Sequence, residues 1–567
     1  MPPADLAPPF GLVLTIGLLV LFYGGTFLMS ARIGRKKENA DSYMNAGHGI
    51  GFGISAASMT ATWIWASSMY ASVTSGYTYG ISGPIHYGLW GALMILFIYP
   101  FGRRIRAVAP HAHTLAEVMH ARHGRSSQLM LAGSNVVGSV ISLMSNLIAG
   151  GALIAMLSPM SFVQGVLVIA AGVLLYTLWS GFRASVLTDF AQVVAMLGAV
   201  VVIVPALFWF LGGTSVFAEG AANVTPEQGS FFSADAFLNQ GAPYIAAVLA
   251  YAIGNQTIAQ RLFAVREDLI KPTFLTATVG YGATIIGVGM VGVLALYAGI
   301  DPADGNANNL LPQVAAGYLP GVLLAVFFVM IIGSLSSTAD SDLAALSSIA
   351  MADFYGQGVR GRGRRADPGT MLLVGRLTMV AATAVAVVFA SLRLDILDLL
   401  VFVGALWGAL VFPVIASFYW TKVTNSAFTV AVLAALAVFL PVRFGAVPAT
   451  GVLPLLVEVL AVVGIGVVLG LMVFGFAGIR PALVVGVLAV LGSAPFALGF
   501  LRAYEALTGS LVAYAVSTVV CWAMSVRNPH DFDFAEISRR TGDFTDDAAS
   551  VGADPDAPTV AGARTEH

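Results

Sequence analysis

Charge and cysteine are scarce in this sequence. Lys, Arg, Asp and Glu make up 10% of its 567 residues, whereas a soluble domain contains about 25%. This scarcity excludes a soluble globular protein, and a hydrophobic content of 58% indicates an integral membrane protein. The single cysteine, Cys521, excludes an intramolecular disulfide framework.

Long apolar runs occur along most of the chain. Read between charged or Pro/Gly-rich breaks, they predict about fifteen membrane helices, near residues 10–29, 52–78, 83–102, 128–157, 160–180, 185–212, 241–263, 273–299, 319–350, 369–391, 395–420, 424–443, 451–475, 480–501 and 507–526. Lipid cannot satisfy free backbone groups, and the runs lack the alternation of a membrane barrel. We therefore expect an all-α membrane protein.

Positive residues are distributed unevenly between the two sides of the predicted spans. With the N-terminus outside, only Arg393, Arg443 and Arg502 of the 27 Lys and Arg residues fall in outside segments. This agrees with the positive-inside rule. It predicts a multi-pass protein of the plasma membrane with an outside N-terminus and a cytoplasmic C-terminus, followed by a disordered tail over 528–567.

A polar cluster, SLSSTADSDL, occupies residues 334–343 directly after an apolar run. Positions three and four apart share a helix face, which predicts one polar stripe made of Ser334, Ser337, Thr338, Ser341 and Asp342. Buried carboxylates in a membrane usually face a cavity, a partner or an ion, and oxygen ligands suit a hard cation such as Na⁺. The alternative is that the hydroxyls bond to their own helix or join neighbouring helices.

Other polar clusters interrupt the predicted spans. Residues 53–83 are rich in small side chains, which favours either close helix packing or an unwound segment at a transport site. The polar residues of 251–267 have two interpretations, a helix break at Asn255 or plain polar packing. We expect Arg261 in this segment to extend to the inner surface. Asp189 begins a span, where it either lines an ion path or stabilises a helix N-terminus.

In this order, the motifs of the chain resemble the sodium:solute symporter family over residues 41–419. The matching residues are Asp41-Ser42-Tyr43 with Ala46-Gly47, TLAEVMHAR at 114–122, Gly181 with Thr188-Asp189 and Gln192, Gln256 with Gln260-Arg261, and Ser337-Thr338 with Ser347-Ser348, Asp353 and Tyr355.

The resemblance implies a leucine-transporter-type 5+5 inverted repeat with one extra N-terminal helix and about four extra C-terminal helices. The implied divisions are 1–51 (first span and linker), 52–212 (first repeat), 213–240 (outside loop), 241–420 (second repeat), 421–527 (additional spans) and 528–567 (tail). It also implies that Na⁺ is a transported coupling ion, without an organic cofactor. Its ligands would be side chains of Ser337 and Thr338 and carbonyls near Ser334, Ser58 and Ala61. Asp189 and Asp342 would serve a second cation or a proton.

Within the family, the sequence is most similar to plant and fungal urea and polyamine transporters. The segments ATWIWASSMYASVTSGYTYGISGPIHYG (61–88) and AVAPHAHTLAEV (107–118) carry this similarity, as does the acid at Asp342. Two residues depart from the pattern, since Asp340 has no counterpart and His86 stands where an aromatic residue is usual.

Urea is flat and neutral, and it both donates and accepts hydrogen bonds. A site for it would stack aromatic rings on its faces and meet its edges with hydroxyls and amides. Trp63, Trp65, Tyr251 and Gln256 are candidates of this kind, although aromatic residues also serve as packing and interface anchors.

These observations predict a cation-coupled symporter that imports a small polar solute, most simply urea with Na⁺. A monocarboxylate, an amino acid or a polyamine, and H⁺ coupling, remain as alternatives. Absence of a mid-membrane Lys or Arg disfavours anions. No nucleophile or metal-ligand motif suggests an enzyme, and no kinase-sized tail suggests a sensor. The expected partners are the solute and the lipid bilayer, without nucleic acid, and the oligomeric state stays open.

Overall fold

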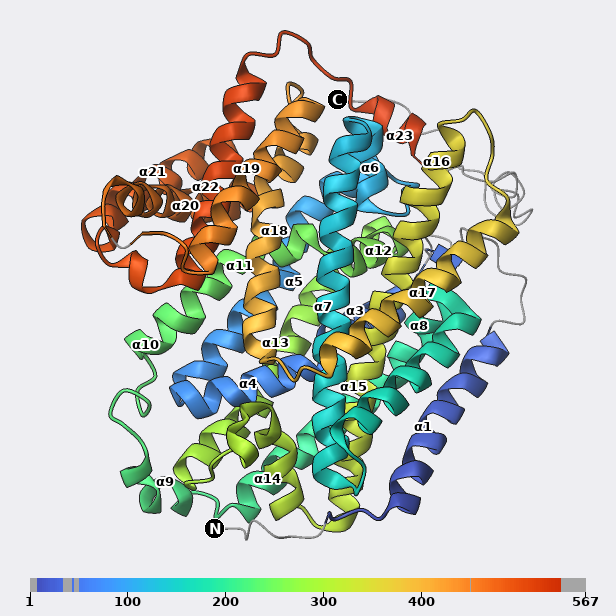
Figure 1. Cartoon of the computed structure of the whole chain (residues 1–567), viewed down its shortest axis with the longest axis vertical. Coiled ribbons are helices and arrows are strands. Elements are labelled where there is room, and N and C mark those ends of the chain that lie inside the picture. Colours follow the sequence, from blue (N-terminus) through green and yellow to red (C-terminus); the bar gives the residue numbers. More distant parts are fainter. Residues whose placement is uncertain (1–7, 34–42, 45–49, 449, 542–567) are drawn as a thin grey trace.

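The described part of the chain is built almost entirely of helices (Figure 1). The computed structural model describes residues 8–33, 43–44, 50–448 and 450–541, and within them the one non-helical pairing is an isolated bridge between Ile50 and Val265. Thirteen described helices are long and apolar enough to cross a membrane. The predicted all-α membrane architecture is therefore confirmed. Four motif residues lie outside the described residues: Asp41, Ser42, Ala46 and Gly47.

The first half of the helices covers the segments expected before residue 270. They are α1 (Leu12–Ile33), α3 (Phe52–Trp63), α4 (Ala66–Tyr79), α5 (Ser82–Val108), α6 (Leu115–Arg122), α7 (Arg125–Leu157), α8 (Phe162–Phe210), α9 (Ser215–Glu219), α10 (Ala234–Ala236), α11 (Ala242–Gly254) and α12 (Gln256–Ala264).

The second half follows a short loop. Its helices are α13 (Ile270–Tyr297), α14 (Leu310–Tyr318), α15 (Gly321–Ser348), α16 (Gln357–Arg360), α17 (Pro368–Ala390), α18 (Ile396–Tyr419), α19 (Asn425–Arg443), α20 (Val452–Ala477), α21 (Ile479–Ala497), α22 (Glu505–Val526) and α23 (Ala535–Arg540).

The sequence predicts about fifteen spans, whereas thirteen described helices are long and apolar enough to cross a membrane. Two segments account for this difference. The segment expected at 52–78 is divided into α3 and α4, each too short to cross a bilayer alone. The segment expected at 160–180 forms the first part of α8, where Phe162–Leu178 is apolar but short. Both segments are therefore helical, although neither is counted among the thirteen long helices.

Two helices are interrupted in the interior. The α3–α4 helix breaks at Ile64, with φ −78° and ψ 77°, and at Trp65, with φ −71° and ψ 142°. The α11–α12 helix breaks at Asn255, with φ −95° and ψ 117°, whose side chain accepts a hydrogen bond from the Thr257 N–H. The ends of a helix leave backbone carbonyls and N–H groups without helical partners, so both breaks expose polar backbone inside the protein.

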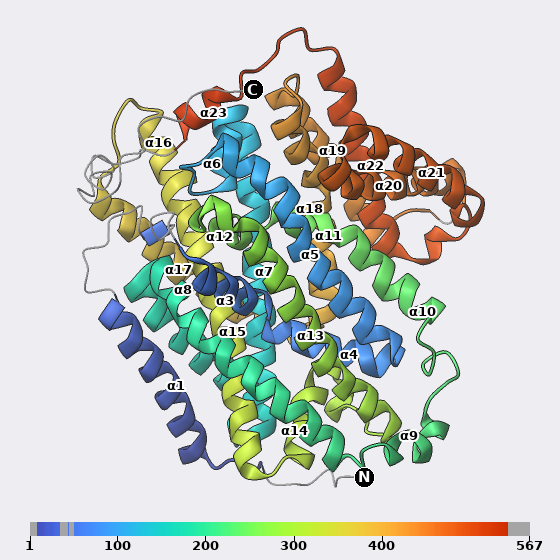
Figure 2. The ribbon, with the colours of Figure 1, turned by 180° about the vertical axis from the view of Figure 1, so that it is seen from behind.

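The broken helices lie in the middle of the molecule. Helix α3 packs against α8, α13 and α15, and the view from behind shows α3, α12 and α15 close to the centre (Figure 2). Helices α19–α22 gather at one edge and α1 lies at the opposite edge beside α8. Close packing of α4 on α13 depends on Gly292, where an added Cβ would lie 1.9 Å from the carbonyl oxygen of Val73.

Candidate functional site

The hydroxyl row of α15 faces the break between α3 and α4. The Ser334 hydroxyl donates a 2.6 Å hydrogen bond to the Ile64 carbonyl, and the Thr338 hydroxyl lies 3.4 Å from the Thr62 carbonyl. Ser334 and Thr338 are at most 1% exposed. The row is therefore turned to the protein interior, against the backbone that the break sets free.

All five residues expected to bind Na⁺ come together at this contact. Ser58 and Ala61 lie on α3, with Ala61 in its last turn, where carbonyls lack helical partners. Ser334, Ser337 and Thr338 lie on α15, and all five residues are buried. Hydroxyl and carbonyl oxygens form a donor set that suits a hard cation, so these residues fit the expected ion by their chemistry.

A buried ion pair lies beside this donor set. The Arg261 Nη2 and Asp189 Oδ2 atoms are 2.9 Å apart, with side-chain exposures of 5% and 0%. Asp189 also accepts hydrogen bonds from the hydroxyls of Ser58, at 2.6 Å, and Ser337. Arg261 donates to Ser341 at 2.7 Å and to Ser58 at 3.1 Å.

The position of Arg261 corrects the expectation that it extends to the inner surface. Its partners on α3, α8 and α15 hold the guanidinium inside the protein. The premise that no basic residue lies within the spans was therefore wrong. Spacing identified Arg261 as part of a Gln-Arg motif, but the direction of its side chain depends on partners that are distant in sequence.

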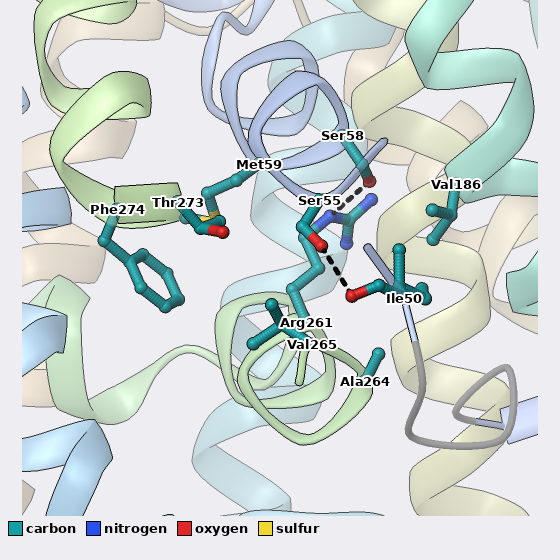
Figure 3. A pocket seen from close by; sticks show the side chains of 10 residues that line it. All are labelled: Ile50, Ser55, Ser58, Met59, Val186, Arg261, Ala264, Val265, Thr273 and Phe274. Carbon is teal, nitrogen blue, oxygen red and sulfur yellow. Dashed lines mark hydrogen bonds between the residues drawn. The ribbon is translucent and has the colours of Figure 1, made fainter. Parts of the chain in front are cut away.

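A small pocket adjoins Arg261 and Ser58. It encloses about 10 Å³ and is lined by α3 with the residue Ile50 before it, by α8, by α12 and the residue after it, and by the start of α13, namely Ile50, Ser55, Ser58, Met59, Val186, Arg261, Ala264, Val265, Thr273 and Phe274. Figure 3 shows the Arg261 guanidinium next to Ser58 at the edge of this pocket.

The two acids of the α15 cluster point to different helices. Asp340 accepts hydrogen bonds from Tyr176 at 2.9 Å and Ser185 at 2.7 Å, both on α8. Asp342 accepts one from Ser142 on α7 at 2.6 Å. Asp340 therefore faces α8, whereas Asp342 faces α7.

Aromatic side chains enclose a second cavity next to the α3–α4 break. It holds about 20 Å³ and is lined by Trp63, Trp65, Ser68, Tyr87, Met94, Tyr244, Tyr251, Tyr281 and Leu400. The rings of Trp63 and Trp65 lie 6.1 Å apart, and each lies 6.2 Å from the Tyr251 ring. The structure thus brings three of the four expected solute residues together.

Two polar groups that line this cavity bond to backbone carbonyls. Trp63 donates its indole N–H to the Gly91 carbonyl at 3.1 Å, and Tyr251 donates its hydroxyl to the Leu400 carbonyl at 2.7 Å. The buried Trp65 Nε1 has no hydrogen-bond partner among the described residues. A bound solute would be the natural acceptor for that donor.

Gln256, the fourth expected solute residue, lies elsewhere. Its Oε1 accepts from the Leu115 N–H at 3.1 Å, and its Nε2 donates to the His113 carbonyl at 3.2 Å. Its amide therefore joins the start of α12 to the start of α6.

Sequence reasoning missed the tyrosines Tyr87, Tyr244 and Tyr281. Tyr244 lies seven residues before Tyr251, and this spacing of two helical turns would have placed both rings on one face of α11. Tyr87 and Tyr281 stand in apolar helices without such a signal.

The model of the sodium:solute symporter family matches residues 43–434. The chain belongs to the sodium:solute symporter family. Members of this family are membrane transporters of small solutes, which are not enzymes.

Individual relatives are distant. A probable urea active transporter 1 of Schizosaccharomyces pombe is 23% identical over 403 residues, which cover 65% of this chain and 59% of that protein. A urea-proton symporter of Oryza sativa subsp. japonica is 26% identical over 216 residues, 38% of this chain and 29% of that protein. The chain thus spans less than two thirds of the length of these relatives.

A solved structure establishes the fold of this chain. A substrate-bound, outward-open structure of a Na⁺-coupled sialic acid symporter superposes with a TM-score of 0.64 at 17% identity, covering 84% of this chain and 97% of the other. The predicted leucine-transporter-type fold is therefore confirmed.

Proposed function

We propose that this symporter couples the entry of Na⁺ to the uptake of urea by alternating access. The observation that carries the proposal is that one helix break serves both sites. Ile64 accepts the hydrogen bond of Ser334 in the cation cluster, and its neighbours Trp63 and Trp65 line the aromatic cavity. A cation that orders this backbone also positions both indoles.

The chemistry of the cavity supports a small, flat and neutral solute. Its nine lining residues include six aromatic side chains and five hydroxyl groups, from Ser68 and four tyrosines, and none of them carries a charge. A monocarboxylate, an amino acid or a polyamine requires a charged or dipolar partner at its ionic group. Urea requires only ring faces and a few hydrogen-bonding groups, such as Trp65 Nε1.

Alternating access follows from the size of the cavity. Its volume of about 20 Å³ corresponds to about one water molecule, so the rings must separate to admit a solute. Rocking of one helix bundle against the other provides this change. The membrane potential contributes about 2.3 kcal/mol per charge per 100 mV, in addition to the ion gradient.

The proposal keeps the predicted topology and cation ligands. The N-terminus lies outside and the C-terminus in the cytoplasm, in the plasma membrane, and the two inverted repeats cover 52–212 and 241–420. Ser337 and Thr338 supply side-chain oxygens to Na⁺, and Ser58, Ala61 and Ser334 supply carbonyls.

A second candidate coupling ion is H⁺, which Asp342 favours. This carboxylate is 2% exposed and is bonded by the Ser142 hydroxyl, and the ion pairs of the described residues do not include it. A buried acid without a basic partner is suited to carrying a proton.

Counterflow of labelled urea in proteoliposomes tests the proposal. We expect exchange to require Na⁺ and to fail when K⁺ replaces it. If exchange does not depend on Na⁺ but responds to a pH step, the coupling ion is H⁺ rather than Na⁺. Thermal stabilisation by urea, acetate, proline and a polyamine, measured in Na⁺ and then in choline, tests the solute separately. We expect urea alone among them to stabilise the protein.

A further inference from the structure

The carboxylate of Asp189 connects an expected cation ligand to a permanent positive charge. Its Oδ1 accepts the hydrogen bond of Ser337, and its Oδ2 accepts that of Arg261 at 2.9 Å. Because Ser337 donates its proton to Asp189, the lone pairs of its oxygen stay available to a cation. Asp189 therefore lies directly behind Ser337, and Arg261 contacts both Asp189 and Ser58.

Several contacts fix Arg261 in this position. The guanidinium also donates to Ser58, Ser341 and the Thr257 carbonyl, at 3.1, 2.7 and 3.3 Å, and lies over the Phe182 ring at 5.4 Å. With its side chain 5% exposed, its charge is weakly screened by water. Arg261 and Asp189 thus form a neutral pair beside the site.

A lone carboxylate at Asp189 would act differently on a bound cation. It would attract the ion through Ser337 and hold it tightly, since Coulomb interactions are strong where water is excluded. An ion held so tightly leaves slowly, and a symporter must release its ion in every cycle. The guanidinium opposes this attraction by neutralising the carboxylate and repelling the cation.

We propose that Arg261 is a positioning residue that weakens the cation site and thereby allows the coupling ion to be released. This inference rests on the proposed Na⁺ coupling. The pocket of Figure 3 is lined both by Ser58, a proposed cation ligand, and by Arg261, so an ion that leaves through this pocket passes the guanidinium.

Opposite effects of the two partners test the inference. Na⁺-dependent thermal stabilisation of the detergent-solubilised full chain measures binding without transport. We expect Arg261→Gln to lower the half-saturating Na⁺ concentration about tenfold or more, and Asp189→Asn to raise it by a similar factor. The double variant, which removes both charges, should return toward the wild-type value.

Release provides a second readout. Efflux of ²²Na⁺ from proteoliposomes should slow in Arg261→Gln in proportion to its tighter binding, whereas Arg261→Lys, which keeps the charge, should stay near wild type. Arg122→Gln is the matched control, because Arg122 is also 5% exposed but lies on α6. Its half-saturating Na⁺ concentration should not change.

Two results would overturn the inference in distinguishable ways. If the wild-type protein responds to Na⁺ but Arg261→Gln binds it equally or more weakly, the arginine only supports the structure and the proposed function stands. If Arg261→Gln does not fold, unchanged Na⁺ binding in Asp189→Asn overturns the inference alone, because the carboxylate then does not attract the ion. If the wild-type protein ignores Na⁺, the proposed coupling fails and the inference with it.

Discussion

The hydroxyl of Ser334 donates a 2.6 Å hydrogen bond to the carbonyl of Ile64, the residue at which the α3–α4 helix is broken. This contact joins the middle of α15 to the first helix of the predicted repeat 52–212. Because Trp63 and Trp65 flank Ile64 and line the aromatic cavity, a change at the α15 contact is one backbone residue away from this cavity.

Replacing Thr338 by Ala should weaken Na⁺ binding far more than solute binding. The change removes one of the proposed side-chain ligands and leaves the aromatic cavity intact. We expect the half-saturating Na⁺ concentration to rise about tenfold, since a bond to a charged group contributes about 1.5–3 kcal/mol. Thr378→Ala in α17 is the control, because that hydroxyl bonds only to the Val374 carbonyl of its own helix. Normal sodium affinity in Thr338→Ala would refute the ligand assignment.

Replacing Trp65 by Phe should weaken solute binding while preserving the response to Na⁺. Phe keeps a ring in the cavity wall but removes the Nε1 donor that lacks a partner among the described residues. A lost hydrogen bond of about 1 kcal/mol raises the half-saturating urea concentration about fivefold. Trp209→Phe is the control, since Trp209 is 76% exposed. An unchanged urea affinity would show that Trp65 packs without binding the solute.

Replacing Gln256 by Leu should lower stability without altering solute selectivity. Leu cannot bond to the Leu115 N–H or the His113 carbonyl, and burying these groups without partners costs about 1–3 kcal/mol each. The measurement is thermal unfolding beside urea titration. The exposed Gln164 of α8 offers the comparison Gln164→Leu, with a smaller effect. A loss of urea affinity at normal stability would instead show that Gln256 contributes to solute binding.

Replacing Asp342 by Asn distinguishes the two coupling ions. Asn keeps an acceptor for the Ser142 hydroxyl but cannot take up a proton at physiological pH. Under Na⁺ coupling, we expect urea uptake driven by a Na⁺ gradient to be retained. Abolished uptake together with a lost response to a pH step would instead assign the coupling proton to Asp342. Asp301→Asn in the loop between α13 and α14, where Tyr77 donates to the carboxylate, controls for the loss of charge.

Local patterns in the sequence were sufficient for the membrane architecture. Hydropathy depends on the composition of a short window, so the apolar runs predicted the helical spans and the all-α class before any contact was known. The hydroxyl row of 334–343 likewise indicated where α15 is polar. The small residues near Ile64 and the polar residue Asn255 indicated where two helices break.

Only the tertiary structure decided which polar groups meet. Arg261 turns inward because Asp189, which is 72 residues away in sequence, meets it there. Asp340 and Asp342 face different neighbours because successive side chains on a helix point in different directions. The aromatic cavity gathers rings from helices as distant in sequence as α3 and α13. Spacing within one segment determines the face on which a side chain lies, whereas the rotation and depth of each packed helix determine what that face contacts.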